Sequence, residues 1–361
     1  MAETTAATGL TVQQWDDKFF VEHIQGNRFS SDMGTSENSI IQVQEDLKKE
    51  KGDSITFALV NRLTGSGVAD GATLEGSEES LDSRSHKLTI GERAHGVRSD
   101  SWQNQISAID LRSAGKMALK TWAVENTRDQ IIAALSSVNG VAYGTANATQ
   151  RNAWLVDNAD RVLFGALVGN GSSNVHATAL ATIDNSADKL TSGAASLMKR
   201  IARTANPKIR PYRSESSNRY YYCMYVGSTL FRDLKTDTVV QTAQRDVSLR
   251  MQNEKLFQGG DIEWDGIIFK EVEDIPATGN VGAASISVSP AYLCGAQAVG
   301  YGCAKRWESA EESFDYGRKK GLAIMEMGGF DKLTFGSGSS DTADLKDHGV
   351  VTGFFASVAD S

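Results

Sequence analysis

Apolar residues near the N-terminus recur at helical spacing in two short segments. Residues 11–24 and residues 38–51 each place apolar side chains three or four positions apart, which predicts two amphipathic helices. The pattern rests on Val12, Trp15, Phe19 and His23 in the first segment and on Ile40, Val43 and Leu47 in the second. Helices of this length barely form alone in water, so we expect both to pack against another surface. Phe20 and Phe29 also need a partner surface, in this molecule or in another.

A different pattern follows, in which apolar and polar residues alternate. Residues 54–62 and, more weakly, residues 86–97 show this alternation, which predicts two strands. Residues 64–84 between them are rich in glycine and acidic residues and poor in apolar ones. A loop of this length within a compact domain is usually functional or mobile. We therefore interpret residues 52–98 as a long hairpin that extends away from the body of the protein.

One long helix is predicted over residues 102–135, which contain no proline and a single glycine. Its apolar face carries Leu111, Ala114, Ala118 and Trp122. At 1.5 Å per residue this helix would reach roughly 50 Å, which is longer than the core of an average domain. Strands are predicted further along the chain at 220–225, 267–272, 322–327 and 350–355, and helical spacing at 239–251. Helices and strands do not alternate as βαβ units, so the fold class is α+β.

The composition is that of an ordinary soluble globular protein, with 361 residues, 40% of them hydrophobic and 23% charged. A net charge of -8 argues against a protein that binds DNA or an anionic membrane directly. No run of about 18 apolar residues is present, so we predict no membrane-spanning helix. The three cysteines form no CxxC pair and are expected to be buried, reduced thiols.

Sequence signatures of catalysis and of metal binding are largely missing. The phosphate-binding loop, the zinc-protease helix motif and the nucleophile elbow are all absent. The stretch Asp261-x-Glu263-x-Asp265-Gly266 imitates the start of a calcium-binding loop, but Val272 stands where that loop needs a glutamate. We interpret it as a charged hairpin turn, and we predict no catalytic, cofactor-binding or metal-binding residue and no cofactor.

A basic cluster lies between residues 199 and 219. It consists of Lys199, Arg200, Arg203, Lys208, Arg210, Arg213 and Arg219, with Glu215 as the only acid. Such a cluster is consistent with a solvated surface, with a nucleic-acid partner or with an acidic protein partner. The chain itself carries a complementary acidic set in the predicted loop, namely Glu75, Glu78, Glu79 and Asp82.

Several short blocks, taken in their order, resemble the major capsid proteins of tailed phages, specifically the coliphage N4-like phage capsid family. The blocks are Leu63-Thr64-Gly65-Ser66-Gly67, Leu74-Glu75-Gly76-Ser77-Glu78-Glu79, Tyr221-Tyr222-Cys223-Met224-Tyr225, Phe231-Arg232-Asp233-Leu234-Lys235, Trp264-Asp265-Gly266-Ile267-Ile268, Cys294-Gly295-Ala296-Gln297-Ala298, the region of Asp315-Tyr316-Gly317, and Gly329-Phe330-Asp331-Lys332-Leu333-Thr334-Phe335. The resemblance extends from about residue 12 to the C-terminus.

The resemblance implies the Hong Kong 97-type phage capsid fold, an α+β fold in five parts. These would be an N-terminal arm (1–51), an extended loop (52–98), a peripheral domain with a long spine helix (99–205), an axial domain (206–305) and C-terminal strands that return to the peripheral domain (306–361). In the phage that names this fold, a lysine of the extended loop joins neighbouring subunits covalently. Residues 64–84 contain no lysine, so we predict a shell without such cross-links.

The function implied is that of a major capsid protein and not of an enzyme. Copies would assemble through pentamers and hexamers, in the host cytoplasm, into the icosahedral shell of the virion. That shell would enclose double-stranded DNA without sequence-specific binding. Scaffold, portal and decoration proteins are further implied partners, and a membrane is not. The alternatives are an encapsulin-like cargo shell of the same fold and a soluble enzyme with a long lid loop.

Thirteen residues of the arm, the loop and the basic cluster are the predicted subunit contacts. They are Trp15, Phe19, Phe20, Phe29, Glu75, Glu78, Glu79, Asp82, Lys199, Arg200, Arg203, Arg210 and Arg213.

Overall fold

The structure is a computed structural model that describes residues 27–45, 52–60, 63, 65, 67–69, 73–79, 83–107, 109–214, 218–247 and 261–357. The chain divides into two units. The first contains Glu92–Asn126 and Lys305–Met327, and the second contains Asn27–Gly91, Thr127–Ala304 and Gly328–Ser361. The helix predicted over residues 11–24 lies outside the described residues.

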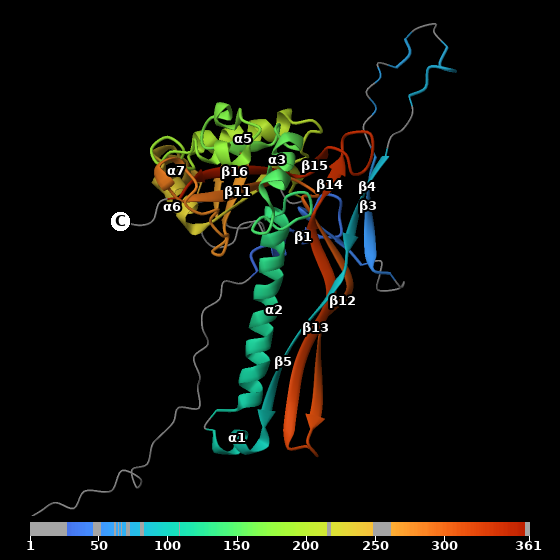
Figure 1. The fold of residues 1–361 in the computed structure, drawn as a ribbon, viewed down its shortest axis with the longest axis vertical. Coiled ribbons are helices and arrows are strands. Elements are labelled where there is room, and N and C mark those ends of the chain that lie inside the picture. Colours follow the sequence, from blue (N-terminus) through green and yellow to red (C-terminus); the bar gives the residue numbers. More distant parts are fainter. Residues whose placement is uncertain are drawn as a thin grey trace, which may run out of the picture. The chain divides into compact units, whose positions relative to one another are not determined.

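A five-stranded sheet has the order β1-β2-β12-β13-β5 (Figure 1). Its strands are β1 (Met33–Gly34), β2 (Ile41–Gln44), β5 (Gly91–Asp100), β12 (Val299–Phe314) and β13 (Lys319–Lys332). Strand β2 corrects the described part of the helix predicted over residues 38–51, of which residues 46–51 lie outside the described residues. Ile41 pairs with Val299 in a parallel ladder and is buried, so pairing with a distant strand decides the conformation against the local helical spacing.

Two helices replace the single one predicted over residues 102–135, namely α1 (Ser101–Ile106) and α2 (Leu111–Ser136). The break has a local cause, because the Ser107 hydroxyl accepts a hydrogen bond from the Ile109 amide and the Asp110 carboxylate accepts one from the Arg112 amide. Serine and aspartate commonly end or begin helices in this way. The predicted apolar face is also corrected, since Ala118 is exposed and its neighbour Leu119 is buried.

The second unit is built on a seven-stranded mixed sheet of order β6-β16-β11-β8-β10-β9, with β7 paired to β8. The strands are β6 (Val162–Phe164), β7 (Tyr212–Arg213), β8 (Tyr220–Val226), β9 (Ile262–Trp264), β10 (Ile267–Glu271), β11 (Val288–Cys294) and β16 (Val350–Ala356). The helices are α3 (Ala148–Asp157), α4 (His176–Leu180), α5 (Ser192–Thr204), α6 (Ser228–Thr236) and α7 (Thr238–Val247), with short 3-10 helices at Ser30–Asp32, Val168–Gly171 and Ala283–Ser285.

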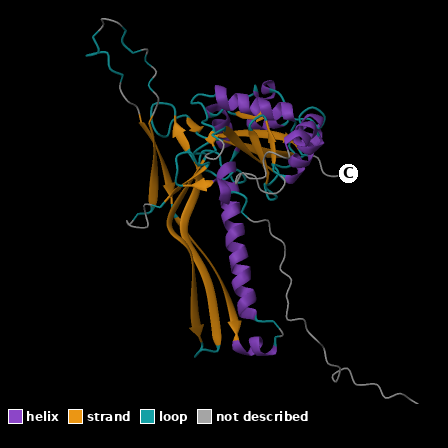
Figure 2. Cartoon of the chain, turned by 180° about the vertical axis from the view of Figure 1, so that it is seen from behind, coloured by secondary structure: helices purple, strands orange, loops and turns teal. Residues whose placement is uncertain are grey.

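Strand β8 shows how this sheet forms the core. Its alternate residues Tyr221, Cys223 and Tyr225 belong to one apolar cluster with the C-terminal turns of α2. Tyr222 and Met224 point to the other face, into a cluster with α5, and helices cover that face in Figure 2. Burial on both faces explains the continuous apolar run, and the strands predicted at 220–225, 267–272, 322–327 and 350–355 are confirmed.

The predicted hairpin is present as β3 (Ser54–Val60) and β4 (Ser83–Thr89), paired from Ser54 opposite Thr89 to Val60 opposite Ser83. The return strand is shorter than predicted, because β5 begins at Gly91 and joins the five-stranded sheet. The interpretation of residues 52–98 as a hairpin that extends away from the body is therefore corrected at the base of the hairpin, which packs on its own unit.

One face of the hairpin is buried on the same unit. Ile55, Phe57 and Leu88 pack against Leu333 and Phe335. Leu333 directly precedes strand β14 (Thr334–Gly336) and Phe335 lies within it. Strand β14 pairs with β15 (Leu345–Asp347). On the hairpin's edge, the Ser85 hydroxyl donates to the Asp341 carboxylate at 2.6 Å. The base of the hairpin is therefore anchored within its own unit.

Candidate subunit-contact surfaces

The acidic loop presents Glu75, Glu78 and Glu79 as exposed side chains. Two of these carboxylates shape the loop, because Glu78 accepts a hydrogen bond from the Gly76 amide at 2.7 Å and Glu79 accepts one from the Gly65 amide at 2.6 Å. The fourth predicted acid, Asp82, lies outside the described residues. The described part of the loop is thus a negatively charged surface whose form depends on its own acids.

Members of the basic cluster have different environments. Lys199 is mostly buried and its ammonium group pairs with the Asp265 carboxylate at 2.7 Å, so its charge is neutralised within the chain. Arg200 and Arg203 are exposed on or beside the last turns of α5. The exposed positive charge in this part of the cluster therefore lies on Arg200, Arg203 and Lys208 and not on Lys199.

Arg210 and Arg213 are exposed at a cleft of about 520 Å³, which Tyr220 also lines. The Arg213 Nε donates to the Asn218 side-chain oxygen at 2.6 Å, and the Arg213 backbone amide donates to the Asn38 side-chain oxygen at 2.9 Å. The cleft combines two cations with an exposed aromatic ring, an arrangement suited to an acidic peptide segment.

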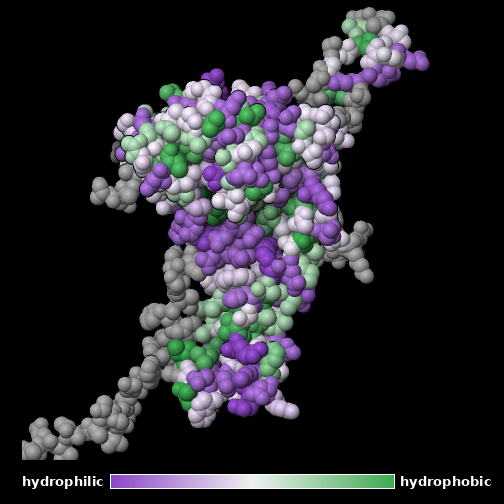
Figure 3. Space-filling model, viewed as in Figure 1, coloured by the Kyte–Doolittle hydropathy of each residue, from purple (hydrophilic) through white to green (hydrophobic). Residues whose placement is uncertain are grey.

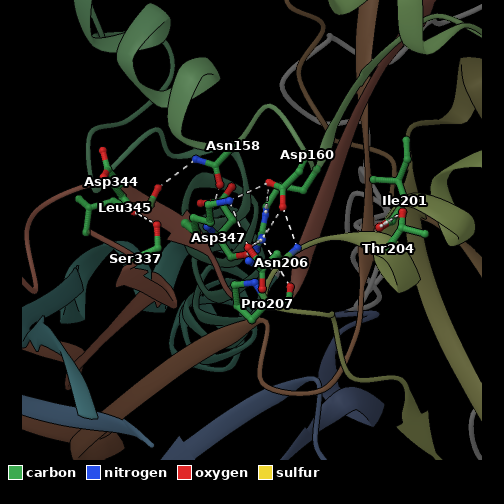
Figure 4. Close-up of polar contacts among 12 residues, drawn as sticks. Asn158, Asp160, Ile201, Thr204, Asn206, Pro207, Ser337, Asp344, Leu345 and Asp347 are labelled. Carbon is green, nitrogen blue, oxygen red and sulfur yellow. Dashed lines mark hydrogen bonds and ion pairs between the residues drawn. The ribbon is translucent and has the colours of Figure 1, made fainter. Parts of the chain in front are cut away.

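A polar network holds Asn206 and Pro207, which lie within the basic cluster (Figure 4). The Asp160 carboxylate accepts a hydrogen bond from the Asn206 amide at 2.8 Å, and the buried Arg161 guanidinium donates to the Asn206 carbonyl at 2.9 Å. Burial alone would raise the pKa of Asp160, but hydrogen bonds and charge from Arg161 bring it below its usual value. Arg161 also donates to the backbone carbonyl of Asp347, which ties residues 206–207 to β15.

Of the four predicted aromatic contacts, only Phe29 lies within the described residues. Its ring is fully buried, with its centroid 4.6 Å from that of Tyr225. Asp32, three residues on, forms a buried ion pair with Lys270 at 2.8 Å. The partner surface of Phe29 is in this molecule, which leaves none of its side chain exposed to a neighbour. Trp15, Phe19 and Phe20 lie outside the described residues.

The sequence reasoning missed an exposed apolar set in the first unit. Trp102 and Ile106 of α1 are 65% and 60% exposed, and apolar colour gathers near α1 in Figure 3. Tyr316 is fully exposed in the turn between β12 and β13 and has a positive φ of 54°. Contiguous exposed apolar patches commonly mark surfaces that a partner covers, and Trp102 and Ile106 lie on one short helix. The signal available was the apolar pair in 102–106, which the single-helix interpretation did not include in its apolar face.

A family model described as phage capsid protein matches residues 3–358. The chain belongs to the phage capsid protein family. It is similar to the major capsid protein of Pseudomonas phage KPP25, with 28% identity over 347 residues that cover 90% of this chain and 89% of that protein.

Solved capsids have the same fold as this capsid protein. The capsid asymmetric unit of cyanophage Pam1 is similar to it with a TM-score of 0.86, 32% identity and complete coverage of both chains. The capsid of Ralstonia phage GP4 gives a TM-score of 0.79 at 21% identity, again over both complete chains. The expected α+β fold of the Hong Kong 97 type is confirmed.

The calcium-like stretch and the cysteines have structural roles in this capsid protein. Asp265 and Gly266, both with positive φ, form the turn between β9 and β10, which confirms the hairpin interpretation of the calcium-like stretch. All three cysteines are free and buried, as expected, and burial raises the pKa of the Cys223 and Cys294 thiols. In the part of the chain that the structure describes, no helix is long and apolar enough to span a membrane, and no three potential ligands gather as a metal site.

Proposed function

We propose that this chain is the major capsid protein of a tailed phage. Copies assemble through pentamers and hexamers into the icosahedral shell that encloses the double-stranded DNA genome, and the protein has no catalytic role. The family match over nearly the entire chain is the observation that carries this proposal. The comparisons give no support to an encapsulin-like cargo shell or to a lidded enzyme. The site of function is the virion, after assembly in the host cytoplasm, with scaffold, portal and decoration proteins as further partners.

The proposal includes the five-part division of the chain. Residues 1–51 serve as the arm, 52–98 as the extended loop, 99–205 as the peripheral domain, 206–305 as the axial domain and 306–361 as the returning strands. The anchored base of the hairpin supports this division, because a fixed base lets the outer loop be presented in one direction to a neighbouring subunit.

The test of assembly is the size of the purified protein. We expect pentamers, hexamers or closed shells in light scattering coupled to gel filtration. Deletion of residues 1–26, which keeps the buried Phe29 and the Asp32–Lys270 ion pair, should lower the yield of shells far more than it lowers the helical signal in circular dichroism. A stable monomer at high concentration, even with scaffold protein present, would contradict the proposal.

Within the shell, we propose that the acidic loop of one subunit forms ion pairs with the arginines of the next. Arg210 and Arg213, at the cleft that Tyr220 also lines, would bind the loop. Exposed pairs contribute only about 0 to 1 kcal/mol each, but many copies repeat them and salt screens them. The substitution Glu75→Lys avoids the two carboxylates that shape the loop.

We expect the Glu75→Lys variant to form shells that dissociate at lower salt than the unmodified protein, and an added Arg210→Glu substitution should restore the original salt response. Glu312→Lys makes the same charge change at an exposed position outside the loop and is the matched control. If the Glu75 variant and this control dissociate at the same salt concentration, the proposed ion pairs between the loop and the arginines are wrong.

A further inference from the structure

His86 lies on strand β4, where the β3–β4 hairpin contacts strand β14 of the same unit. Its side chain is 11% exposed. The imidazole meets the ring of Phe335 edge-on, with the two centroids 6.2 Å apart. A titratable ring is therefore enclosed between the hairpin and the surface on which the hairpin packs.

Both nitrogens of this ring face oxygen atoms. The Nδ1 atom lies 3.0 Å from the backbone carbonyl oxygen of Thr334 and 3.2 Å from the hydroxyl of the same residue. On the other side of the ring, Nε2 lies 3.3 Å from a carboxylate oxygen of Asp331. A carbonyl oxygen and an ionised carboxylate only accept hydrogen bonds. A proton on both nitrogens therefore makes both contacts attractive.

The neutral imidazole carries a single N–H and does not fit these surroundings as well. With the proton on Nδ1, the lone pair of Nε2 faces the Asp331 carboxylate. With the proton on Nε2, Nδ1 can accept from the Thr334 hydroxyl, but its lone pair then stands 3.0 Å from the carbonyl oxygen. The imidazolium ion avoids both repulsions, and its charge strengthens the contact with the carboxylate. The protonated ring is therefore the form that suits the docked hairpin.

Asp331 is the acid that faces His86. Strands β3 and β14 pack beside the ring and carry no charged residue. The other charged or titratable groups on the surrounding elements are Arg84, Lys87, Lys332, Asp341, Lys346, Asp347 and His348. Arg84, two residues away on β4, donates to the backbone carbonyl of Gly338.

Three of these groups have partners of their own. Lys332 and Asp347 form a buried ion pair at 2.7 Å. Asp341 accepts from Ser85, whose side chain lies on the opposite face of β4 because successive side chains of a strand alternate. His348 is neutral at pH 7, since burial lowers its pKa to about 4. The contact between His86 and Asp331 is therefore the charge interaction that changes when the ring takes up a proton.

We propose that His86 is a protonation-sensitive clasp that holds the β3–β4 hairpin on its own unit more firmly in acid than at neutral pH. Histidine titrates between pH 5 and 8, and the folded hairpin favours the charged ring. The hairpin therefore gains stability as the pH falls through this range and loses it as the pH rises. The acidic loop connects the two strands, so the clasp controls how firmly the base of that loop is held. The inference concerns the folded chain and does not rest on assembly.

Hydrogen–deuterium exchange of the full-length protein at pH 8 and at pH 5.5 tests the clasp, with each observed rate divided by the intrinsic rate at that pH. We expect the ladder amides of residues 54–60 and 83–89 to be about fivefold better protected at pH 5.5. His86→Gln keeps a polar side chain that does not titrate, and Asp331→Asn removes the carboxylate, so each should abolish this gain. Equal protection of the unmodified protein at the two pH values, or the same gain in the His86→Gln variant, would overturn the inference.

Two further variants separate the clasp from its neighbours. His348→Phe removes the adjacent histidine, and the gain in protection at pH 5.5 should persist in it. Thr334→Val removes the hydroxyl and keeps the carbonyl, so the gain should persist here as well. Loss of the gain in the His348 variant would assign the pH dependence to His348 and contradict the clasp. An equal loss of protection at both pH values in the Thr334 variant, without any gain at pH 5.5, would show that a neutral ring accepts from the hydroxyl and would also contradict it.

Discussion

Replacing Phe57 with alanine is expected to loosen the β3–β4 hairpin without unfolding the protein. The ring is 4% exposed and packs with Leu333 and Phe335. The substitution therefore removes a side chain whose apolar surface is almost entirely buried. Buried Phe→Ala substitutions cost about 3–5 kcal/mol. The cluster contains few other residues, so the loss falls on the docking of the hairpin. We expect a local destabilisation near the lower end of that range, about 3 kcal/mol.

Hydrogen–deuterium exchange measures this local stability. A loss of about 3 kcal/mol makes the ladder amides of residues 54–60 and 83–89 exchange roughly 100-fold faster. Thr56→Ala is the matched control, because Thr56 lies on the same strand with its side chain exposed. Unchanged exchange in the Phe57 variant, or equal acceleration in both variants, would refute the claim that this ring anchors the hairpin.

Gly300 provides an independent check of the same contact. A Cβ atom at this position would lie 2.9 Å from Cζ of Phe57 and 3.0 Å from Leu333. Gly300→Ala should therefore cost about 1–3 kcal/mol, as other overpacked cores do. In the Phe57→Ala background the added methyl group enters vacated space, so the second substitution should cost less than it does alone. Strict additivity would show that the two residues do not compete for that space.

Three further predictions concern the folded chain and the particle. Asp32→Asn leaves the buried Lys270 charge unpaired and should lower the free energy of unfolding by about 3–5 kcal/mol in urea, against about 1 kcal/mol for Ser31→Ala. An equal effect of the two substitutions would contradict the importance of this ion pair. His348 has its pKa lowered from 6.5 to about 4, mainly by burial, so protonation favours the unfolded chain and stability falls as the pH drops from 6.5 toward 4. At pH 5 this loss is about 2 kcal/mol, and a His348→Phe variant with the same pH dependence as the unmodified protein would disprove the assignment. Finally, particles boiled in detergent and reductant should run as a single band near 38.9 kDa, because the nearest lysine to the loop, Lys87, lies within β4, and a ladder of larger bands would contradict this.

Local patterns in the sequence predicted the elements that local chemistry determines. The alternation in residues 54–60 predicts a strand of the hairpin correctly because one face of that strand is buried. The Asp265-Gly266 pair predicts a turn correctly because both residues adopt a positive φ there. Strand β2 could not be predicted in this way. Its spacing suits a helix, and only its pairing with a strand more than 250 residues away makes it extended.

The same limit applies to the contact surfaces. The acidic character of the loop was visible in the sequence, and its described acids are exposed. The neutralisation of Lys199 by Asp265 was not visible, since 66 residues separate the partners. The contact of His86 with Thr334 was not visible either, since 248 residues separate the two.

Electron microscopy of the protein, expressed alone and together with scaffold protein, tests the central claim most directly. Negatively stained samples should contain closed, hollow shells of uniform diameter, and three-dimensional averaging should show icosahedral symmetry with pentamers at the vertices. A field of dispersed monomers or small oligomers, under conditions where the chain is folded and in the presence of scaffold protein, would contradict the assignment of this chain as a shell-forming capsid protein.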